Sequence, residues 1–303
     1  MVRRFFKQLG QGSESGISLI YAVCGFSLLS IGDSIIKTMN GAFPAPAVSA
    51  LRYVFGALGL LVTVLIVRGR DGLIFPKPWL HIGRALSVSL ATLCFFLAIY
   101  VMPLAEATAI QFTAPIFTAL LSAIFLKERA PRAVWVAIIF AFAGVLLVLR
   151  PQIAVLGLPA LLPLGAALGM SCLMIFNRKA AGVAPILEMQ LLIAILAAPV
   201  LITAAIVGHY SGVPQYHIPL PDWSVVVKCA IVAMTATFSH MLIYMATVRT
   251  NAAVVAPMTY IQLLVAVTIG WFAFGDVPDF STIAGAALIV AGGLYLWRSV
   301  GKK

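Results

Sequence analysis

Three ionisable side chains inside long apolar stretches of this sequence are candidates for binding chemistry. Asp33 and Arg52 occupy similar depths in the first two stretches, and Glu106 begins the fourth, three residues after Pro103. A charged side chain inside a lipid bilayer is costly and commonly serves an ion or a charged solute. We therefore expect Asp33 or Arg52 to contact a charged group of a substrate, and Glu106 to accept an amine or to carry a proton.

Each of these charges also has a structural interpretation. Asp33 and Arg52 are placed to form an ion pair between two helices, and Asp33 precedes Lys37 by one turn, which suits a pair within one helix. Glu106 lies in the first turn of its helix, where the helix dipole stabilises a carboxylate. The sequence leaves the binding and structural interpretations open.

Four further side chains are candidates to line a substrate cavity. His240, in the eighth stretch, suits a proton or substrate contact, or a hydrogen-bonded packing role. Gln111 and Gln262 lie in corresponding helices, where amides line a cavity or hold helices together. Tyr260 is in the middle of the ninth stretch and suits an aromatic wall.

Two prolines interrupt corresponding stretches, Pro115 in the fourth and Pro257 in the ninth. Breaks at matched positions of two halves point to a binding site and to helix bending during gating. The alternative is a pair of tolerated kinks.

The elements that position these residues are membrane helices. Of the 303 residues, 62% are hydrophobic and 10% are charged, against roughly 25% charged residues in a soluble domain. This composition excludes a soluble enzyme, a nucleic-acid-binding module and a disordered chain. We predict an all-α polytopic membrane protein with ten transmembrane helices of about 20 residues each. Their expected ranges are 17–37, 46–67, 82–101, 104–126, 133–149, 155–176, 186–207, 225–247, 251–274 and 281–298.

The basic excess of the chain, a net charge of +11, is explained by topology. With the N-terminus in the cytoplasm, most Lys and Arg residues, Arg84 among them, fall in cytoplasmic segments. Only Lys37, Arg150 and Lys228 fall in external ones. Positive charge collects on the cytoplasmic side of membrane proteins. We therefore expect both termini in the cytoplasm and no nucleic-acid partner.

The second half of the chain repeats the first. A shift of 144 residues places Gly25 on Gly169, and a shift of 148 places Glu128 on Asp276 in a matching turn between helices. Five helices per repeat is an odd number, so the two repeats have opposite orientations, as in alternating-access transporters. The expected repeats are 17–150 and 151–298, with cytoplasmic segments 1–16 and 299–303 at the ends.

Several motifs of the chain match those of a known family. They are Leu51-Arg52-Tyr53, Pro103-Leu104-Ala105-Glu106-Ala107-Thr108-Ala109-Ile110, Phe112-Thr113-Ala114-Pro115-Ile116-Phe117, Leu126-Lys127-Glu128-Arg129 and Ala143-Gly144-Val145-Leu146-Leu147. With these motifs the chain resembles the ten-helix EamA-type members of the drug/metabolite transporter superfamily. The resemblance implies a secondary carrier for a small organic solute, multi-pass in a bacterial inner membrane.

No constellation of catalytic residues is present in the sequence. Gly-x-Ser-x-Gly, His-Glu-x-x-His and P-loop motifs are missing, so we expect no enzyme activity, no ATP site, no metal and no cofactor. The alternative from another class is an intramembrane enzyme, which needs a nucleophile and a base at one depth. A channel needs a continuous polar stripe, whereas the polar residues here are isolated.

The mixture of charges, amides and aromatic rings suits a zwitterionic or amphipathic metabolite that is amino-acid-, nucleoside- or vitamin-like. The motif at 103–110 is also similar to that of family carriers for S-adenosylmethionine and riboflavin, so an uptake carrier of that type is the alternative, with a drug exporter third. The expected partners are this solute, the lipid bilayer and protons as the coupling ion, for a monomer or homodimer.

Overall fold

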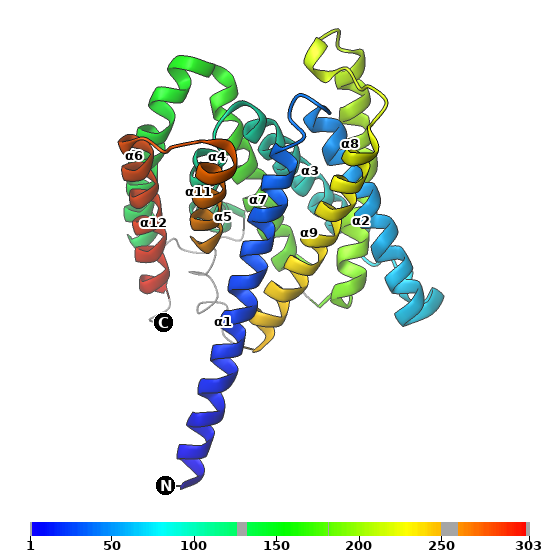
Figure 1. Cartoon of the computed structure of the whole chain (residues 1–303). Coiled ribbons are helices and arrows are strands. Elements are labelled where there is room, and N and C mark those ends of the chain that lie inside the picture. Colours follow the sequence, from blue (N-terminus) through cyan, green and yellow to red (C-terminus); the bar gives the residue numbers. More distant parts are fainter. Residues whose placement is uncertain (1, 126–131, 181, 250–259, 301–303) are drawn as a thin grey trace.

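The computed structural model describes residues 2–125, 132–180, 182–249 and 260–300, and every regular element in that part of the chain is a helix (Figure 1). The long helices are α1 (Val2–Lys37), α2 (Ala45–Arg68), α3 (Pro78–Val101), α4 (Leu104–Gln111), α5 (Ala114–Phe125), α6 (Arg132–Leu156), α7 (Leu162–Lys179), α8 (Ile186–Tyr210), α9 (Trp223–Arg249), α11 (Tyr260–Phe274) and α12 (Phe280–Val300). Short 3-10 helices occupy Gly69–Gly72, Leu158–Leu161 and Pro214–Tyr216.

Six helical segments among the described residues are long and apolar enough to cross a membrane: Ile20–Lys37, Ala45–Gly72, Pro78–Val101, Leu158–Lys179, Ile186–Tyr210 and Trp223–Ile243. Shorter apolar stretches cover Ile261–Phe274 and Phe280–Gly292. The helical content fits the polytopic membrane class, while ten spans in two inverted repeats stay a prediction.

The fourth expected helix is interrupted. α4 ends at Gln111 and α5 begins at Ala114, with a turn at Phe112 and Thr113 between them. Pro115 is the second residue of α5 and has no N–H to donate to the carbonyl of Gln111, so a continuous helix would lack that hydrogen bond. The corresponding Pro257 lies outside the described residues.

The helices pack in pairs that join the two halves of the chain. α1 runs along α9, α3 along α7, α2 along α8, and α6 along α12. In Figure 1 the pair of α6 and α12 forms one side of the bundle and the pair of α2 and α8 forms the other. α1, α4, α5 and α11 lie between these two sides.

Two of these interfaces are built around matching glycines. A Cβ atom on Gly169 of α7 would lie 2.7 Å from the backbone nitrogen of Ala91 and 2.9 Å from the oxygen of Ser87 on α3. A Cβ atom on Gly25 of α1 would lie 2.8 Å from the side chain of Ile243 on α9. Because lipid is as apolar as the core, close backbone approach of this kind holds membrane helices together.

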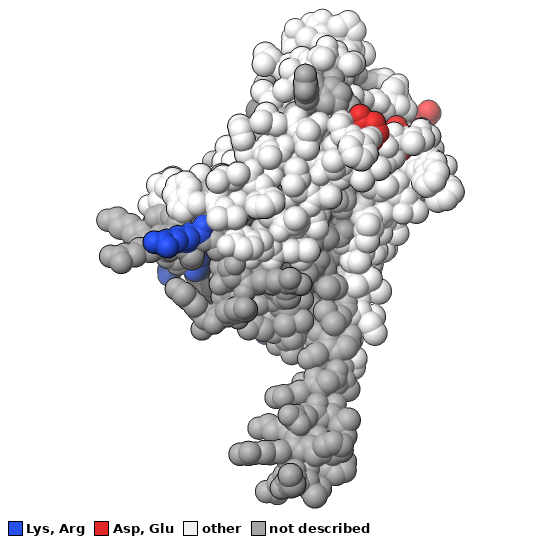
Figure 2. Space-filling view, turned by 90° about the vertical axis from the view of Figure 1, so that its left-hand side faces the viewer, with Lys and Arg blue, Asp and Glu red and all other residues white. Residues whose placement is uncertain are grey.

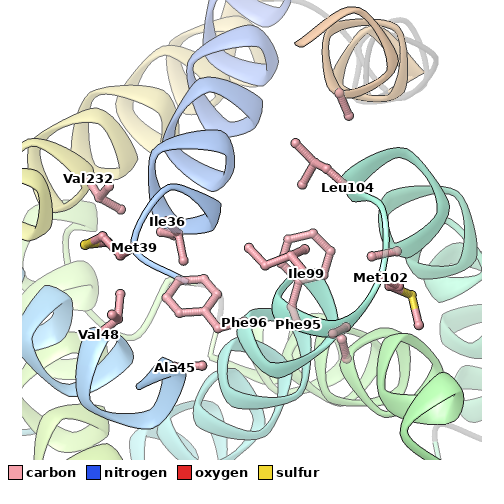
Figure 3. Packing of buried hydrophobic residues seen from close by; sticks show 14 of the residues in the cluster. Ile36, Met39, Ala45, Val48, Phe95, Phe96, Ile99, Met102, Leu104 and Val232 are labelled. Atoms are coloured by element: carbon pink, nitrogen blue, oxygen red, sulfur yellow. The ribbon is translucent and has the colours of Figure 1, made fainter. Parts of the chain in front are cut away.

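We call one end of the bundle the Lys37 end. This end comprises the C-terminal ends of α1 and α3, the turn to α4, and the loop between α11 and α12. Buried side chains pack together there. Figure 3 shows the apolar part of this end, with Ile36 from α1 and Met39 from the turn after α1 packed near Phe96 and Ile99 from α3. The N-terminus lies at the opposite end (Figure 1).

The charges on one face of the molecule are separated along the bundle (Figure 2). Described Lys and Arg residues lie nearer the end that carries the N-terminus, and Asp and Glu residues lie nearer the Lys37 end. The described surface between them is uncharged on this face, as a lipid-facing belt requires.

Substituting Gly169 by Ala tests the close packing of α3 against α7. The added methyl group would meet backbone atoms of Ala91 and Ser87, and overpacking of a close interface costs about 1–3 kcal/mol. We expect a lower melting temperature for detergent-purified Gly169→Ala. Gly56→Ala is the control, because no atom lies within 4 Å of the position that its added methyl group would take. Equal melting temperatures for the two variants would contradict the packing argument.

Candidate functional site

A small cavity of about 10 Å³ lies between α1, α2 and α9. It is lined by Leu29, Gly32, Asp33, Arg52, Val232, Thr235 and Ala236. α1 places Asp33 one turn before its end, and α2 places Arg52 two turns after its start. Two of the predicted binding residues, one acidic and one basic, therefore face the same space. Ligand pockets commonly enclose about 300–1,000 Å³, so this cavity does not hold an organic solute in the conformation that the structure shows.

Asp33 is held by a residue from the second half of the chain. The side-chain amide of Gln262, on α11, donates a hydrogen bond to a carboxylate oxygen of Asp33 (3.3 Å). The hydroxyl of Ser30 donates to the backbone oxygen of Gln262 (3.1 Å). Asp33 and Gln262 were predicted separately from the sequence, and the structure brings them together.

Arg52 rests against aromatic rings. Its guanidinium carbon lies 5.3 Å from the ring centre of Tyr53 and 5.4 Å from that of Phe96, within the range of cation–π attraction. Among the described residues Arg52 forms no direct ion pair with Asp33, although its charge acts on that carboxylate. Both charged groups therefore line one cavity without forming an ion pair with each other.

The other predicted cavity residues have different positions. His240 lies on α9, one turn after the cavity-lining Ala236, and its side chain is exposed. The positive charge of Arg52 acts on it electrostatically. Gln111 is the half-buried last residue of α4, directly before the break. Tyr260 is the first residue of α11, and its side chain lies outside the described residues.

Glu106 belongs to a second polar cluster, at the Lys37 end. Its side chain is buried, and one carboxylate oxygen accepts a hydrogen bond from the hydroxyl of Thr282 on α12 (3.3 Å). The ammonium of Lys37 lies 2.5 Å from a carboxylate oxygen of Asp276 and 4.9 Å from the ring centre of Phe274. Lys37 is therefore paired with Asp276, on the loop after α11, and not with Asp33.

Asp279 completes this cluster by capping α12. A carboxylate oxygen of Asp279 accepts the backbone N–H of Thr282 (2.7 Å), and the other accepts the hydroxyl of Ser281 (2.9 Å). Hydrogen bonds from Thr282 and Ser281 favour the ionised form and hold the pKa of Asp279 below its usual value. The cap fixes the start of α12 beside Glu106.

A third polar cluster was missed by the sequence analysis. The guanidinium of Arg84 on α3 is buried and donates to the side-chain oxygen of Asn177 on α7 (2.7 Å) and to the backbone oxygen of Met189 on α8 (3.1 Å). It also lies 3.1 Å from Nδ1 of His81. Arg84 was expected on the cytoplasmic side at the start of the third helix, and it lies in the second turn of α3, which begins at Pro78, with its side chain buried in the bundle. The spacing of His81 and Arg84, three residues apart in an apolar run, was the available signal.

The comparisons with known proteins agree with a membrane carrier. The model of the EamA-like transporter family matches residues 16–150 and 157–298. The S-adenosylmethionine uptake transporter of Rickettsia prowazekii is 25% identical, with 90% of this chain and 91% of that protein covered. The pseudopaline exporter CntI of Pseudomonas aeruginosa is 28% identical, with 94% and 97% covered. The riboflavin transporter of Rhizobium johnstonii is 25% identical, with 93% and 90% covered.

One solved structure has a similar fold. It is described as a crystal structure of a protein, and its TM-score is 0.60 at 19% sequence identity. The similarity covers 95% of this chain and 99% of that chain. At this identity it concerns the fold alone.

Replacing Arg84 by Met tests whether the third cluster joins α3 to α7 and α8. The change leaves the acceptors on the half-buried Asn177 and Met189 without their donor, which costs about 1–3 kcal/mol of folding free energy. We expect Arg84→Met to unfold at lower SDS concentration in mixed micelles, followed by circular dichroism. Arg70→Met, at an exposed position, is the control. If both variants unfold alike, Arg84 does not join these helices.

Proposed function

Because the chain belongs to the EamA-like transporter family, as its motifs predicted, we propose that it carries a small organic metabolite across the bacterial inner membrane as a secondary transporter. The observation that carries this proposal is the cavity in which Asp33 and Arg52 face the same space. One wall comes from the first half of the chain and the other from the second. Separation of these walls would admit a solute from one side at a time.

The proposed solute carries an anionic and a cationic group, or is amphipathic. Asp33 suits an amine or another cationic group, and Arg52 suits a carboxylate or phosphate through its planar set of donors. The rings of Tyr53 and Phe96 beside Arg52 add flat apolar surface. An S-adenosylmethionine-like or riboflavin-like solute is the second candidate, favoured by the names of the relatives.

Two inverted five-helix repeats are the proposed basis of alternating access. The family model matches the chain twice, once in each half. The hydroxyl of Ser30 bonds the backbone oxygen of Gln262, and that of Ser171 bonds the backbone oxygen of Ala114 (2.8 Å). Ala114 and Gln262 correspond under the same shift of 148 residues that relates the turns. The donors Ser30 and Ser171 are offset by three residues under the shift of 144, so the contacts match as helix pairs: α1 contacts α11 as α7 contacts α5, which supports the repeat.

The proposed orientation has both termini in the cytoplasm and the Lys37 end outside. Single cysteines at Thr38 and at Lys179, in a background without the native cysteines, test this orientation in intact cells. A membrane-impermeant maleimide should label Thr38→Cys, and Lys179→Cys only after the cells are opened. Both positions are exposed, so access to the reagent decides the result. The reverse pattern would overturn the orientation.

Binding of metabolites to the purified protein tests the proposed solute class. In a thermal-shift screen over amino acids, nucleosides, vitamins and sugars, we expect the compounds that raise the melting temperature to share a charged pair or an amphipathic ring system. Asp33→Asn and Arg52→Gln should each weaken binding of such compounds about 10- to 100-fold, the worth of one charge-assisted hydrogen bond. Asp71→Asn and Arg70→Gln remove exposed charges and serve as controls. Unchanged binding by both cavity variants would exclude this cavity as the site.

A further inference from the structure

The proposed solute site leaves Glu106 without a role, although its environment is unusual. Its side chain is 7% exposed, and its second carboxylate oxygen, Oε2, is buried with no hydrogen-bond partner among the described residues. An ionised carboxylate that is buried without partners costs far more free energy than the neutral, protonated acid does. The site therefore suits a protonated Glu106 in this conformation.

A cation that would pair with an ionised Glu106 lies in the same cluster. Lys37, at the end of α1, has its ammonium on Asp276 and is near enough for its charge to act on Glu106. The contact with Asp276 links the first half of the chain to the second. A contact with Glu106 would instead stay within the first half, because α1 and α4 both belong to it.

The exchange of Lys37 between these two carboxylates would open or close the Lys37 end. While Lys37 is on Asp276, the end of α1 is tied to the loop between α11 and α12. When Lys37 moves to an ionised Glu106, the ion pair that ties the end of α1 to the loop between α11 and α12 is lost. The other groups that face Glu106 are Thr282 and Asp279. The carboxylate of Asp279 accepts the hydrogen bonds that cap α12. Its negative charge repels a negative charge on Glu106.

We propose that Glu106 is the proton-binding group that couples transport to the proton gradient, by competing with Asp276 for the ammonium of Lys37. This inference rests on the proposed carrier function and orientation. In the outward-open state the Glu106 carboxylate holds Lys37. A proton from external water binds that carboxylate, neutralises it and frees Lys37 for Asp276, which closes the Lys37 end.

The same proton leaves when the opposite end of the bundle opens and water reaches α4. The carboxylate then regains its charge and draws Lys37 away from Asp276, which reopens the Lys37 end. One proton therefore enters the cell in each cycle, without any covalent change in the protein. The solute moves with the proton in symport or on the return step in antiport.

The distance between the two halves at the Lys37 end tests this exchange without any known solute. Spin labels are attached at Ala42→Cys and Phe280→Cys, two exposed positions, in a background without the native cysteines. Distances are measured by pulsed electron paramagnetic resonance in lipid nanodiscs across a pH series. In the otherwise wild-type chain, we expect a short distance at low pH and a growing long-distance population as the pH rises.

Variants of the two competing carboxylates should respond in opposite directions. Glu106→Gln mimics the protonated side chain and should keep the short distance at every pH. Asp276→Asn leaves only Glu106 for Lys37 and should enlarge the long-distance population at the pH at which the wild type is half closed. Glu188→Gln is the matched control, because Glu188 is also buried with one unpartnered oxygen, and it should keep the wild-type response.

Two results would overturn the proton site: a wild-type pH response in Glu106→Gln, or loss of that response in Glu188→Gln. If Glu106→Gln does not fold, Glu106→Asp retains a carboxyl group and must keep a pH-dependent distance, and its failure to do so counts against the site equally. Metabolite binding by the Asp33 and Arg52 variants is measured separately. Failure of the distance response with intact metabolite binding removes the proton site and leaves the carrier function standing.

Discussion

Every charge inside an apolar helix bundle must find its partner within the protein, and this constraint organises the whole structure. Only 10% of the residues are charged, and lipid offers their side chains neither water nor counter-ions. The buried charges of the described residues are gathered into three clusters, around Asp33, Glu106 and Arg84, and one ion pair of the buried Glu188 with Arg68. Each cluster joins helices from different halves of the chain. The polar contacts that satisfy the charges therefore also decide which helices are tied together.

The clusters differ in how completely their charges are satisfied, and this difference separates structure from proposed function. Arg84 has neutral acceptors on α7 and α8 and joins three helices firmly. Asp33 and Arg52 share a cavity without pairing, which leaves charge available for a solute. At the Lys37 end the ammonium of Lys37 pairs with Asp276, and its charge also acts on the nearby Glu106. Incomplete pairing is what permits a bundle to exchange partners between two conformations.

The sequence predicted the helical elements and two of the residues that line the cavity, because both follow from local rules, while the binding role of these residues stays a prediction. Apolar runs located the helices, Pro115 indicated the break after Gln111, and charges inside apolar runs selected Asp33 and Arg52. The partner of Lys37 was not predictable in this way. Asp276 is more than two hundred residues away in the chain, whereas Asp33 is one turn away and satisfies the local rule. The contacts of Arg84 with Asn177 and Met189 were not predictable either, because these partners lie about a hundred residues further along the chain.

Access to the cavity from the two sides of the membrane is the most direct test of a carrier that alternates between two states. A single cysteine at Ala236, which lines the cavity, is treated with an impermeant thiol reagent from either side of oriented vesicles. Alternating access predicts reaction from both sides. A crosslink between Lys37→Cys and Asp276→Cys, made with a bifunctional thiol reagent that spans the length of the ion pair, should then abolish reaction from the outside and leave reaction from the cytoplasm. Reaction from both sides despite that crosslink, or from one side only without it, would contradict alternating access through this cavity.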